Sequence, residues 1–423
     1  MLATSWLARR LFLTMKTKRS FFSCVGAALA STFLGAGLFG AESATAAASI
    51  EEAFTKGKVS LNIRARYEGV EQTGLLDADA LTVRTRLGFT TAPLYGFKAM
   101  LEAEDVTAID GDRYSQAGIN PGGAGRAVVA DPDDTEINQA WLAYATGKTT
   151  FTGGRQRIVY DNVRFVGDVG WRQNAQTFDA VSLTDKSVDK LTLHYAYLYR
   201  INRVFSDRHP QGNWDSDSHL FNASYALSPA ATLTGYAYLL EFENAVANSS
   251  ATYGASVTGT PALNDMLKLS YRGEYAHQSD YRSNPVGYDT DYLALELGVI
   301  AKQGSLSLGY EELGTDNGVG FKTPLATLHA FNGWADVFLT TPADGLRDTY
   351  VKAGANLPGA ISLLAFYHTF ETDRGADLGE EWDVQLSRKF GKYFTGLVKY
   401  ADFQSDSAMA DVRKIWIQVE FVF

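Results

Sequence analysis

Apolar and polar residues alternate along many short stretches of this 423-residue chain. In residues 59–67 every second position is apolar, and the positions between them are polar and include Arg64 and Arg66. A period of two puts the two sets on opposite faces of an extended strand. Residues 81–90 and 267–278 repeat the pattern. The sequence therefore predicts strands with one apolar face and one polar face.

About 18 segments carry this alternation, and most of them are 10 to 13 residues long. A strand that crosses a bilayer at a tilt needs about 9–11 residues. The segments are 58–68, 80–90, 95–106, 134–146, 149–158, 174–184, 189–200, 217–227, 230–241, 250–259, 265–277, 289–299, 303–312, 347–356, 359–370, 378–389, 392–403 and 410–423.

The connections between these segments alternate in length. Short turns such as Gly147-Lys148 and Ser228-Pro229 follow the even segments, and longer loops follow most of the odd ones. This alternation is typical of outer-membrane barrels, which have tight periplasmic turns and long extracellular loops. The sequence thus predicts an all-β protein, a transmembrane antiparallel up-and-down β-barrel of about 18 strands. The predicted loops are 69–79, 107–133, 159–173, 201–216, 278–288 and 313–346.

Residues 325–338 fit two descriptions. They could form a nineteenth strand, but Leu325, Leu328, Phe331 and Ala335 have helical spacing. An even number of strands favours a helix or an ordered loop within 313–346. Such a segment could cap or narrow the pore, but we favour the interpretation that it is a packed loop.

The first 46 residues have the features of a secretory signal peptide. Residues 15–19 are basic, residues 21–39 are apolar and small, and Ala44-Thr45-Ala46 gives a cleavage pattern. A short membrane anchor is the alternative, but glycines interrupt the apolar stretch. We expect residues 47–423 to form the barrel. The single cysteine, Cys24, lies in the signal segment, so the barrel has no disulfide, thiolate metal site or cysteine nucleophile.

Charge and hydropathy exclude several classes of protein. Removing residues 1–46 takes away five basic residues and one acidic residue, which leaves 33 basic and 47 acidic residues and a net charge of −14. Nucleic-acid binding needs a basic surface, so it is disfavoured. No segment after residue 46 offers 18 uncharged apolar residues, so helical membrane spans are excluded. A secreted β-protein or an outer-membrane barrel remains.

The sequence gives little support to an enzyme. Its six histidines are scattered without metal-ligand spacing, and no nucleophile elbow or phosphate-binding loop is present. A serine–histidine pair, as in a barrel lipase, would be visible only in space. An energy-coupled receptor needs a plug domain and more strands than this chain can supply. We therefore predict no catalytic site and no cofactor.

The chain ends in an alternating segment, residues 415–423, with Phe423 as the last residue. Outer-membrane barrels typically end in such a strand, and the barrel-insertion machinery recognises its terminal phenylalanine. A chance edge strand is the alternative. After so many alternating segments, we interpret the ending as the insertion signal.

Several stretches resemble the alginate-export family of outer-membrane proteins. The matching stretches are Arg64–Arg66, Arg84–Gly88, Ile137–Trp141, Gly154–Gln156, Arg164–Gly167, Trp171–Asn174, Thr177–Ala180, Phe321–Ala326, His329–Trp334 and the closing strand. The resemblance implies a monomeric barrel of 18 strands in the outer membrane of a Gram-negative type of cell. It also implies an arginine-rich constriction that passes a uronate polymer outward.

Residues 153–181 hold the densest run of arginine in the chain. Arg155, Arg157, Arg164 and Arg172 occur there among aromatic and amide residues, together with Asp161, Asp168 and Asp179. Arginine suits a carboxylated sugar because its planar guanidinium binds carboxylate at two points and stays ionised. We expect the pore-lining set to be Arg64, Arg66, Arg84, Arg86, Arg155, Arg157, Arg164, Arg172 and Asp179, the last two arginines from a loop that folds inward.

Each of these arginines has a structural alternative. An arginine inside a barrel commonly pairs with an acid on a neighbouring strand and braces the wall. The candidate partners are Glu68, Glu102, Glu104, Asp161 and Asp179.

Acidic residues of the predicted loops raise the question of calcium. Asp110 with Asp112, and Asp131 with Asp133 and Asp134, could supply carboxylate ligands. Neither group completes a calcium-loop motif. We therefore predict a solvated acidic surface and no metal.

Three functions agree with these observations. The first is a passive outer-membrane channel for anionic saccharides, by resemblance an exporter of an alginate-like polymer. The second is a general or substrate-specific uptake porin for small anionic solutes. The third is a structural or adhesive barrel whose long loops bind a partner.

Overall fold

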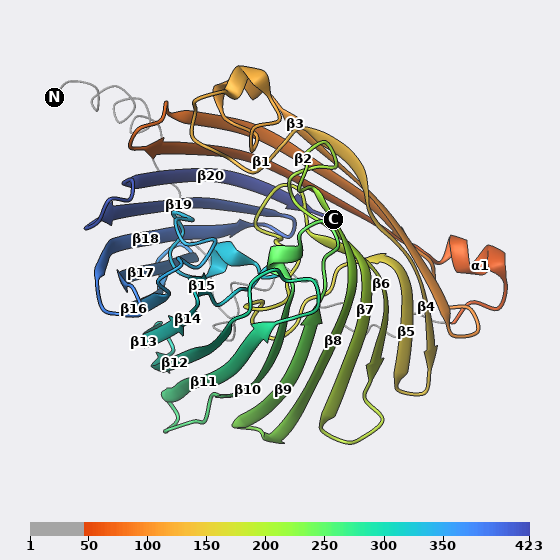
Figure 1. Ribbon diagram of the computed structural model, residues 1–423. Helices are drawn as coiled ribbons and strands as arrows, with labels where there is room; N and C mark the ends of the chain where they lie inside the picture. The colour runs from red at the N-terminus through yellow and green to blue at the C-terminus, as the bar shows by residue number, and fades with distance from the viewer. Residues whose placement is uncertain (1–45) are drawn as a thin grey trace. The chain divides into compact units, whose positions relative to one another are not determined.

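The alternating segments form the wall of one closed barrel in the computed structural model of the protein, which describes residues 46–423. Each wall strand pairs antiparallel with the wall strands before and after it along the chain (Figure 1). The ring closes where the first and last strands pair, with Tyr67 opposite Ile417. The predicted antiparallel barrel of 18 strands is thereby confirmed.

The wall strands are β1 (Lys58–Gln72), β2 (Ala78–Thr90), β3 (Phe97–Ala108), β4 (Asp134–Thr146), β5 (Thr149–Gln156), β6 (Thr177–Asp185), β7 (Leu191–Asn202), β8 (Asn213–Ser228), β9 (Ala231–Leu240), β10 (Ser250–Gly259), β11 (Leu267–Asp280), β12 (Asp289–Ala301), β13 (Gly304–Leu313), β16 (Leu346–Leu357), β17 (Ile361–Glu371), β18 (Asp377–Phe390), β19 (Phe394–Ser405) and β20 (Val412–Val422). The remaining elements are α1 (Ile50–Thr55), the small hairpin β14 (Thr315–Asp316) with β15 (Val319–Gly320), and single 3-10 turns at Gly111–Arg113, Pro121–Gly123, Val246–Asn248 and Leu328–Ala330.

The two faces of the wall differ as the alternation predicts. Along β20, Ile417 and Val419 are exposed, whereas Trp416 and Gln418 are buried. On β2, Leu87 is 56% exposed while its chain neighbour Arg86 is 7% exposed. A surface that faces lipid tails must be apolar, and its backbone N–H and C=O groups must all be paired. A closed barrel with an apolar outward band meets both requirements. The polar face of the strands therefore points into the barrel.

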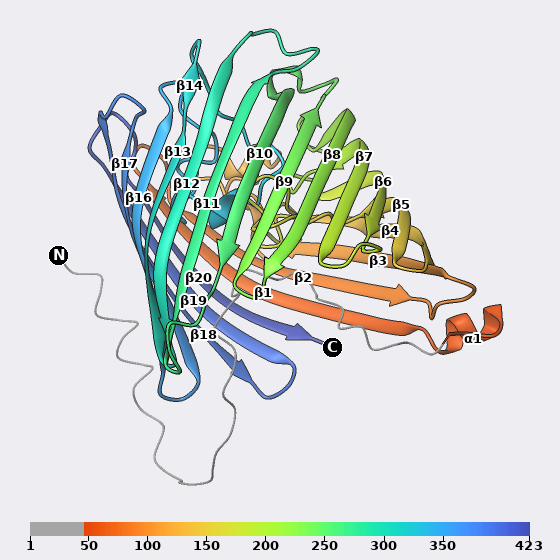
Figure 2. The same cartoon turned by 90° about the horizontal axis from the view of Figure 1, so that it is seen from below.

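The short turns and the N-terminal helix lie at one end of the barrel (Figure 2). Helix α1 is fixed there because Ala92 N, in the turn after β2, donates to Ala53 O at 2.8 Å. The turn between β4 and β5 has only two residues, and Gly147 adopts a φ of 59° in it. Glycine takes this left-handed conformation without strain, which permits so tight a reversal.

The segment expected to be a helix or an ordered loop is an ordered loop. Residues 314–345 contain the β14–β15 hairpin and the 3-10 turn Leu328–Ala330. Within residues 46–423, no helix is long and apolar enough to cross a membrane. The expected signal peptide lies outside the described residues, apart from Ala46.

Candidate functional site

Two long loops pair with each other inside the barrel. The β5–β6 loop (residues 157–176) meets the β13–β16 loop (residues 314–345) through a bridge between Val166 and Leu325. Gly167 N donates to Leu325 O at 2.9 Å. The two loops therefore form one inner layer against the polar face of the wall.

Arg164 fixes this inner layer to the wall. Its side chain is 1% exposed, and its Nε donates to Glu311 Oε1 on β13 at 2.7 Å. Its Nη2 donates to Asn332 Oδ1 in the β13–β16 loop at 3.1 Å. Burial opposes the charge of Arg164, but Glu311 and Tyr292 hold its pKa above the ordinary value. One guanidinium thus joins both loops and one wall strand.

Arg172, later in the β5–β6 loop, also fixes the inner layer to the wall. Its Nη1 lies 3.0 Å from Glu68 Oε2 on β1, and its Nη2 lies 2.9 Å from Asp336 Oδ2 in the β13–β16 loop. Burial opposes its charge, but Glu68 and Asp336 raise its pKa. Both loop arginines of the predicted site therefore hold loops in place.

Arg64 and Arg84 lie on the inner side of neighbouring strands and share one acid. Their Nη2 atoms each lie 3.1 Å from Glu420 Oε1 on β20. Arg64 Nη1 also donates to Trp171 O in the β5–β6 loop at 3.1 Å. Three strands and one loop therefore meet at this pair of arginines.

Arg66 and Arg86 are also buried and paired. Arg66 Nη2 donates to Gln418 Oε1 at 2.7 Å, and its Nη1 lies 3.6 Å from Asp131 Oδ2. Arg86 Nε pairs with Glu104 on β3. These contacts agree with the structural alternative for the wall arginines, since each has an acidic partner.

Three arginines of the predicted site nevertheless have buried N–H groups without an acceptor in the described part of the chain, one on Arg66 and two each on Arg84 and Arg157. Arg157, directly after β5, lies 3.3 Å through Nη1 from Asp168 Oδ2. Its Nε and Nη2, and the Nε and Nη1 of Arg84, are buried and have no hydrogen-bond acceptor among residues 46–423. Burial lowers the pKa of Arg157, and nearby Arg86 lowers it further. Buried donors without acceptors are places where an anion gains most.

Arg155 and Asp179 do not lie where the sequence analysis expected them. Arg155 is in register with Ala140, which is exposed, and has the same strand parity as exposed Phe151. The structure therefore puts Arg155 on the outward side of the wall, where its Nε donates to Asp179 Oδ1 at 2.8 Å. The expectation that Arg155 and Arg157 share the inner face was wrong because β5 ends at Gln156 and the chain then turns inward.

The sequence analysis missed a buried cluster around Lys399 on β19. Lys399 Nζ lies 3.6 Å from the ring centre of Trp334 and 4.2 Å from that of Trp171. It also contacts His329 Nε2 at 2.6 Å, and His329 Nδ1 contacts Asp336 Oδ1 at 2.7 Å. Strand alternation puts Lys399 on the inner face, but only the folded loop shows which aromatic rings surround it.

Asp336 is the acid that unites this cluster. It contacts Arg172, His329 and Lys414, the last through Nζ at 2.8 Å. Burial opposes its charge, but His329 and Lys414 together with Arg172 hold its pKa well below the ordinary value. Three positively charged or hydrogen-donating groups from different elements thus converge on one carboxylate.

Asp131 departs from the expected solvated acidic surface. It is 0% exposed, and its Oδ1 accepts from Gln173 N at 2.7 Å. Its neighbour Asp133 stays exposed and accepts from Ala108 N. Asp131 is buried because Arg66 and Arg172 approach its other oxygen. Residues 46–423 contain no group of three or more acids or histidines arranged to hold a metal ion.

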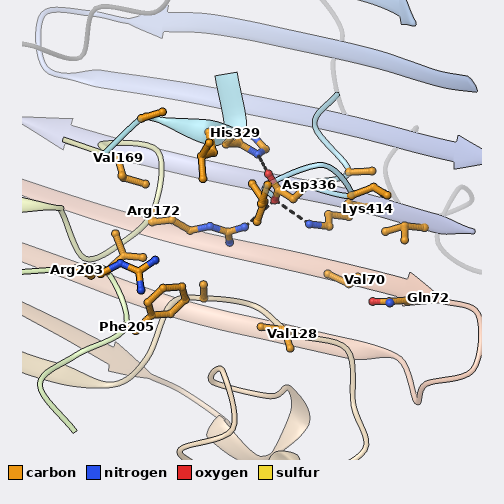
Figure 3. A pocket seen from close by; sticks show the side chains of 18 of the residues that line it. Val70, Gln72, Val128, Val169, Arg172, Arg203, Phe205, His329, Asp336 and Lys414 are labelled. Carbon is orange, nitrogen blue, oxygen red and sulfur yellow. Dashed lines mark hydrogen bonds and ion pairs between the residues drawn. The ribbon is translucent and has the colours of Figure 1, made fainter. Parts of the chain in front are cut away.

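A pocket of about 630 Å³ lies among the loops above this inner layer (Figure 3). We name it the outer-loop pocket. The β3–β4, β5–β6, β7–β8, β13–β16 and β19–β20 loops line it, together with the loop-side ends of β1 and β20. Its polar side chains include Arg172, Arg203, Asp336 and Lys414, and most of the others are apolar.

Solved outer-membrane channels have the same fold. The chain superposes on Acinetobacter baumannii OccAB4 with a TM-score of 0.68 at 14% identity, covering 87% of this chain and 98% of that one. Pseudomonas aeruginosa OccK9 (OpdG) gives 0.70 at 16% identity, with 88% and 100% covered. Pseudomonas aeruginosa OpdK with vanillate gives 0.69 at 14% identity, with 88% and 99% covered. A comparison with curated protein sequences found no match.

The family model of alginate export matches residues 58–284. This match and the barrel fold indicate a channel in the outer membrane of a Gram-negative type of cell, and the similar proteins are channels rather than enzymes. The apolar outer band fits contact with membrane lipid, and the closed barrel fits a monomer. The chain belongs to the alginate export family.

Proposed function

We propose that this outer-membrane channel is selective for small organic anions, above all carboxylates, that pass the arginines on the inner side of the wall. The observation that carries the proposal is Arg157, whose side chain is 20% exposed and whose Nε and Nη2 have no acceptor among residues 46–423. Guanidinium groups stay ionised at neutral pH and bind carboxylate oxygens at two points. The loops fixed by Arg164 and Glu311 support a narrow path, and hence a small solute.

A structurally similar protein has been solved with a ligand of this size and charge. Pseudomonas aeruginosa OpdK was crystallised with vanillate, a small aromatic carboxylate. The likeness supports small carboxylates as the class of solute.

Outward passage of a uronate polymer is the second candidate, and the charge of the turn end favours it. Of the 14 lysines in residues 46–423, ten lie in α1, in the short turns or within a few residues of them. These are Lys56, Lys58, Lys98, Lys148, Lys186, Lys190, Lys268, Lys302, Lys389 and Lys392. A basic mouth attracts a polyanion from the periplasmic side. The family's name agrees with this candidate.

Single-channel recording in a planar bilayer tests the proposal and separates the two candidates. We expect anion-selective conductance that glucuronate, a monosaccharide carboxylate, blocks and uncharged glucose does not. Block only by long oligouronates added at the turn side would favour the polymer exporter. Cation selectivity with no block by any uronate would refute both.

The closing strand supports insertion of the barrel by the cell's assembly machinery. In the folded barrel, Phe423 N donates to Leu61 O at 2.9 Å and Leu61 N donates to Phe423 O at 3.0 Å, which completes the seam. Deletion of Phe423 should lower the amount of folded protein in outer-membrane fractions. Unchanged assembly of the deletion variant would argue against recognition through this residue.

A further inference from the structure

The outer-loop pocket combines an apolar lining with few charges. Apolar side chains reach it from the β3–β4 loop with Val128, from the β7–β8 loop with Phe205, and from the β13–β16 loop with Leu328, Val337 and Leu339. Its volume of about 630 Å³ is in the range of sites for small organic molecules. Such a lining favours a ligand with an apolar body, and a uronate chain has polar groups on every ring.

Most charges at this pocket are already neutralised. Arg172 pairs with Glu68 and Asp336, and Lys414 pairs with the same Asp336. These groups therefore offer little net attraction to a second anion. Instead, these ion pairs hold the loops that line the pocket in place.

Arg203 is the exception. No carboxylate of the described chain, residues 46–423, forms an ion pair with it. Its guanidinium lies over the rings of Trp214 at 4.0 Å and Phe205 at 4.7 Å, and its Nη1 donates to Gln211 O at 3.1 Å. Burial lowers its pKa to about 10, so Arg203 remains charged at neutral pH. Figure 3 shows Arg203 and Phe205 side by side at one wall of the pocket.

We infer that the outer-loop pocket binds an amphipathic monocarboxylate, whose carboxylate pairs with Arg203 and whose aromatic or acyl body lies against Phe205 and the apolar loop residues. A half-buried guanidinium without an acidic partner gains a charge-assisted bond from such a ligand. The inference rests on the proposed function, because it makes the pocket the first binding site for carboxylates that then enter the channel. It narrows the solute class to carboxylates with an apolar body.

Calorimetric titration of the protein in lipid nanodiscs with 3-phenylpropanoate tests this inference. Empty nanodiscs correct for partition of the probe into lipid. We expect Arg203→Gln to weaken binding by about tenfold or more, since one charge-assisted bond is lost. Phe205→Ala should also weaken it. Arg208→Gln is the matched control, because Arg208 is an exposed arginine of the same loop and does not line the pocket.

The comparison ligands separate charge from apolar contact. The neutral amide of the same acid lacks the carboxylate, and glucuronate lacks the apolar body, so both should bind more weakly. Arg203→Lys keeps the charge and should retain part of the affinity if it folds as the native protein does. Equal binding of the amide or of glucuronate, or native affinity in Arg203→Gln, would overturn the inference. Anion selectivity in bilayers without 3-phenylpropanoate binding would overturn this inference alone and leave the proposed function standing.

Discussion

Arg164 in the β5–β6 loop donates to Glu311 on β13 at 2.7 Å across 147 positions of sequence. The two groups are 1% and 7% exposed, so the pair is shielded from water. Arg164 also donates to Asn332 of the β13–β16 loop. The pair therefore helps to fix both inner loops against the wall.

Loss of this pair should open the channel. Arg164→Ala leaves Glu311 buried without its cationic partner, which typically lowers the free energy of unfolding by about 3–5 kcal/mol. The loosened loops should also raise single-channel conductance. Urea unfolding of the refolded protein and bilayer recording measure the two effects.

An exposed ion pair supplies the control for that experiment. Arg282 pairs with Asp217 at the loop end, and both side chains are more than 40% exposed. Arg282→Ala should match the native protein in both measurements, since exposed pairs contribute little. If Arg164→Ala behaved like this control, the inner layer would not depend on Arg164.

The stability of the inner layer should depend on pH through His329. Burial lowers the pKa of His329 well below its ordinary value, and the charges of Lys399 and Arg172 lower it further, although Asp336 opposes them. The unfolded chain then binds a proton at a higher pH than the folded chain does. The contribution of His329 to the free energy of unfolding is thus fully present above about pH 6.5 and is lost as the pH falls below it.

Unfolding midpoints measured between pH 7.5 and 5.5 check this expectation. One proton accounts for at most about 1.4 kcal/mol per pH unit. His329→Gln should reduce the slope. A native slope in His329→Gln would contradict the account of the buried cluster.

Gly333 of the β13–β16 loop lies directly against Glu381 on β18. Its φ is 84°, and a Cβ there would lie 2.2 Å from Glu381 Oε2. Gly333→Ala should therefore force the loop away from β18 and destabilise the protein by about 2 kcal/mol or more. Unfolding in urea measures the loss.

Gly318 is the matched control in the same loop. Its φ is 75°, but a Cβ there would meet nothing within 4 Å. Gly318→Ala should show only the backbone strain, about 1 kcal/mol. Equal losses in the two variants would mean that contact with Glu381 does not limit the loop position.

Alternation predicted the barrel wall because successive side chains of a strand point to opposite faces, and the membrane requires the outward face to be apolar. Strands β4 (Asp134–Thr146) and β10 (Ser250–Gly259) have the bounds that the sequence pattern gave them. The short turns were equally predictable, since tight reversals have few conformations. These features depend on the local sequence and on the boundary between the lipid outside the barrel and its polar interior.

The inner layer could not be predicted in the same way. The partner of Arg164 lies on a strand that no local pattern connects to it, and Asp131 is buried only because two arginines from other segments converge on it. Arg155 shows a different limit. Its charge suggested the inner face, whereas strand parity and the pairing with Asp179 fix it on the outer face.

The most direct test of the channel's selectivity compares Arg157→Gln with Arg155→Gln. These arginines are two residues apart on opposite sides of the wall, so the second variant controls for the loss of one positive charge in the same segment. The measurement is the reversal potential of a single channel in a potassium chloride gradient. We predict anion selectivity in the native protein and in Arg155→Gln, and a shift toward cations in Arg157→Gln. Cation selectivity of the native protein, or equal shifts in both variants, would contradict the account.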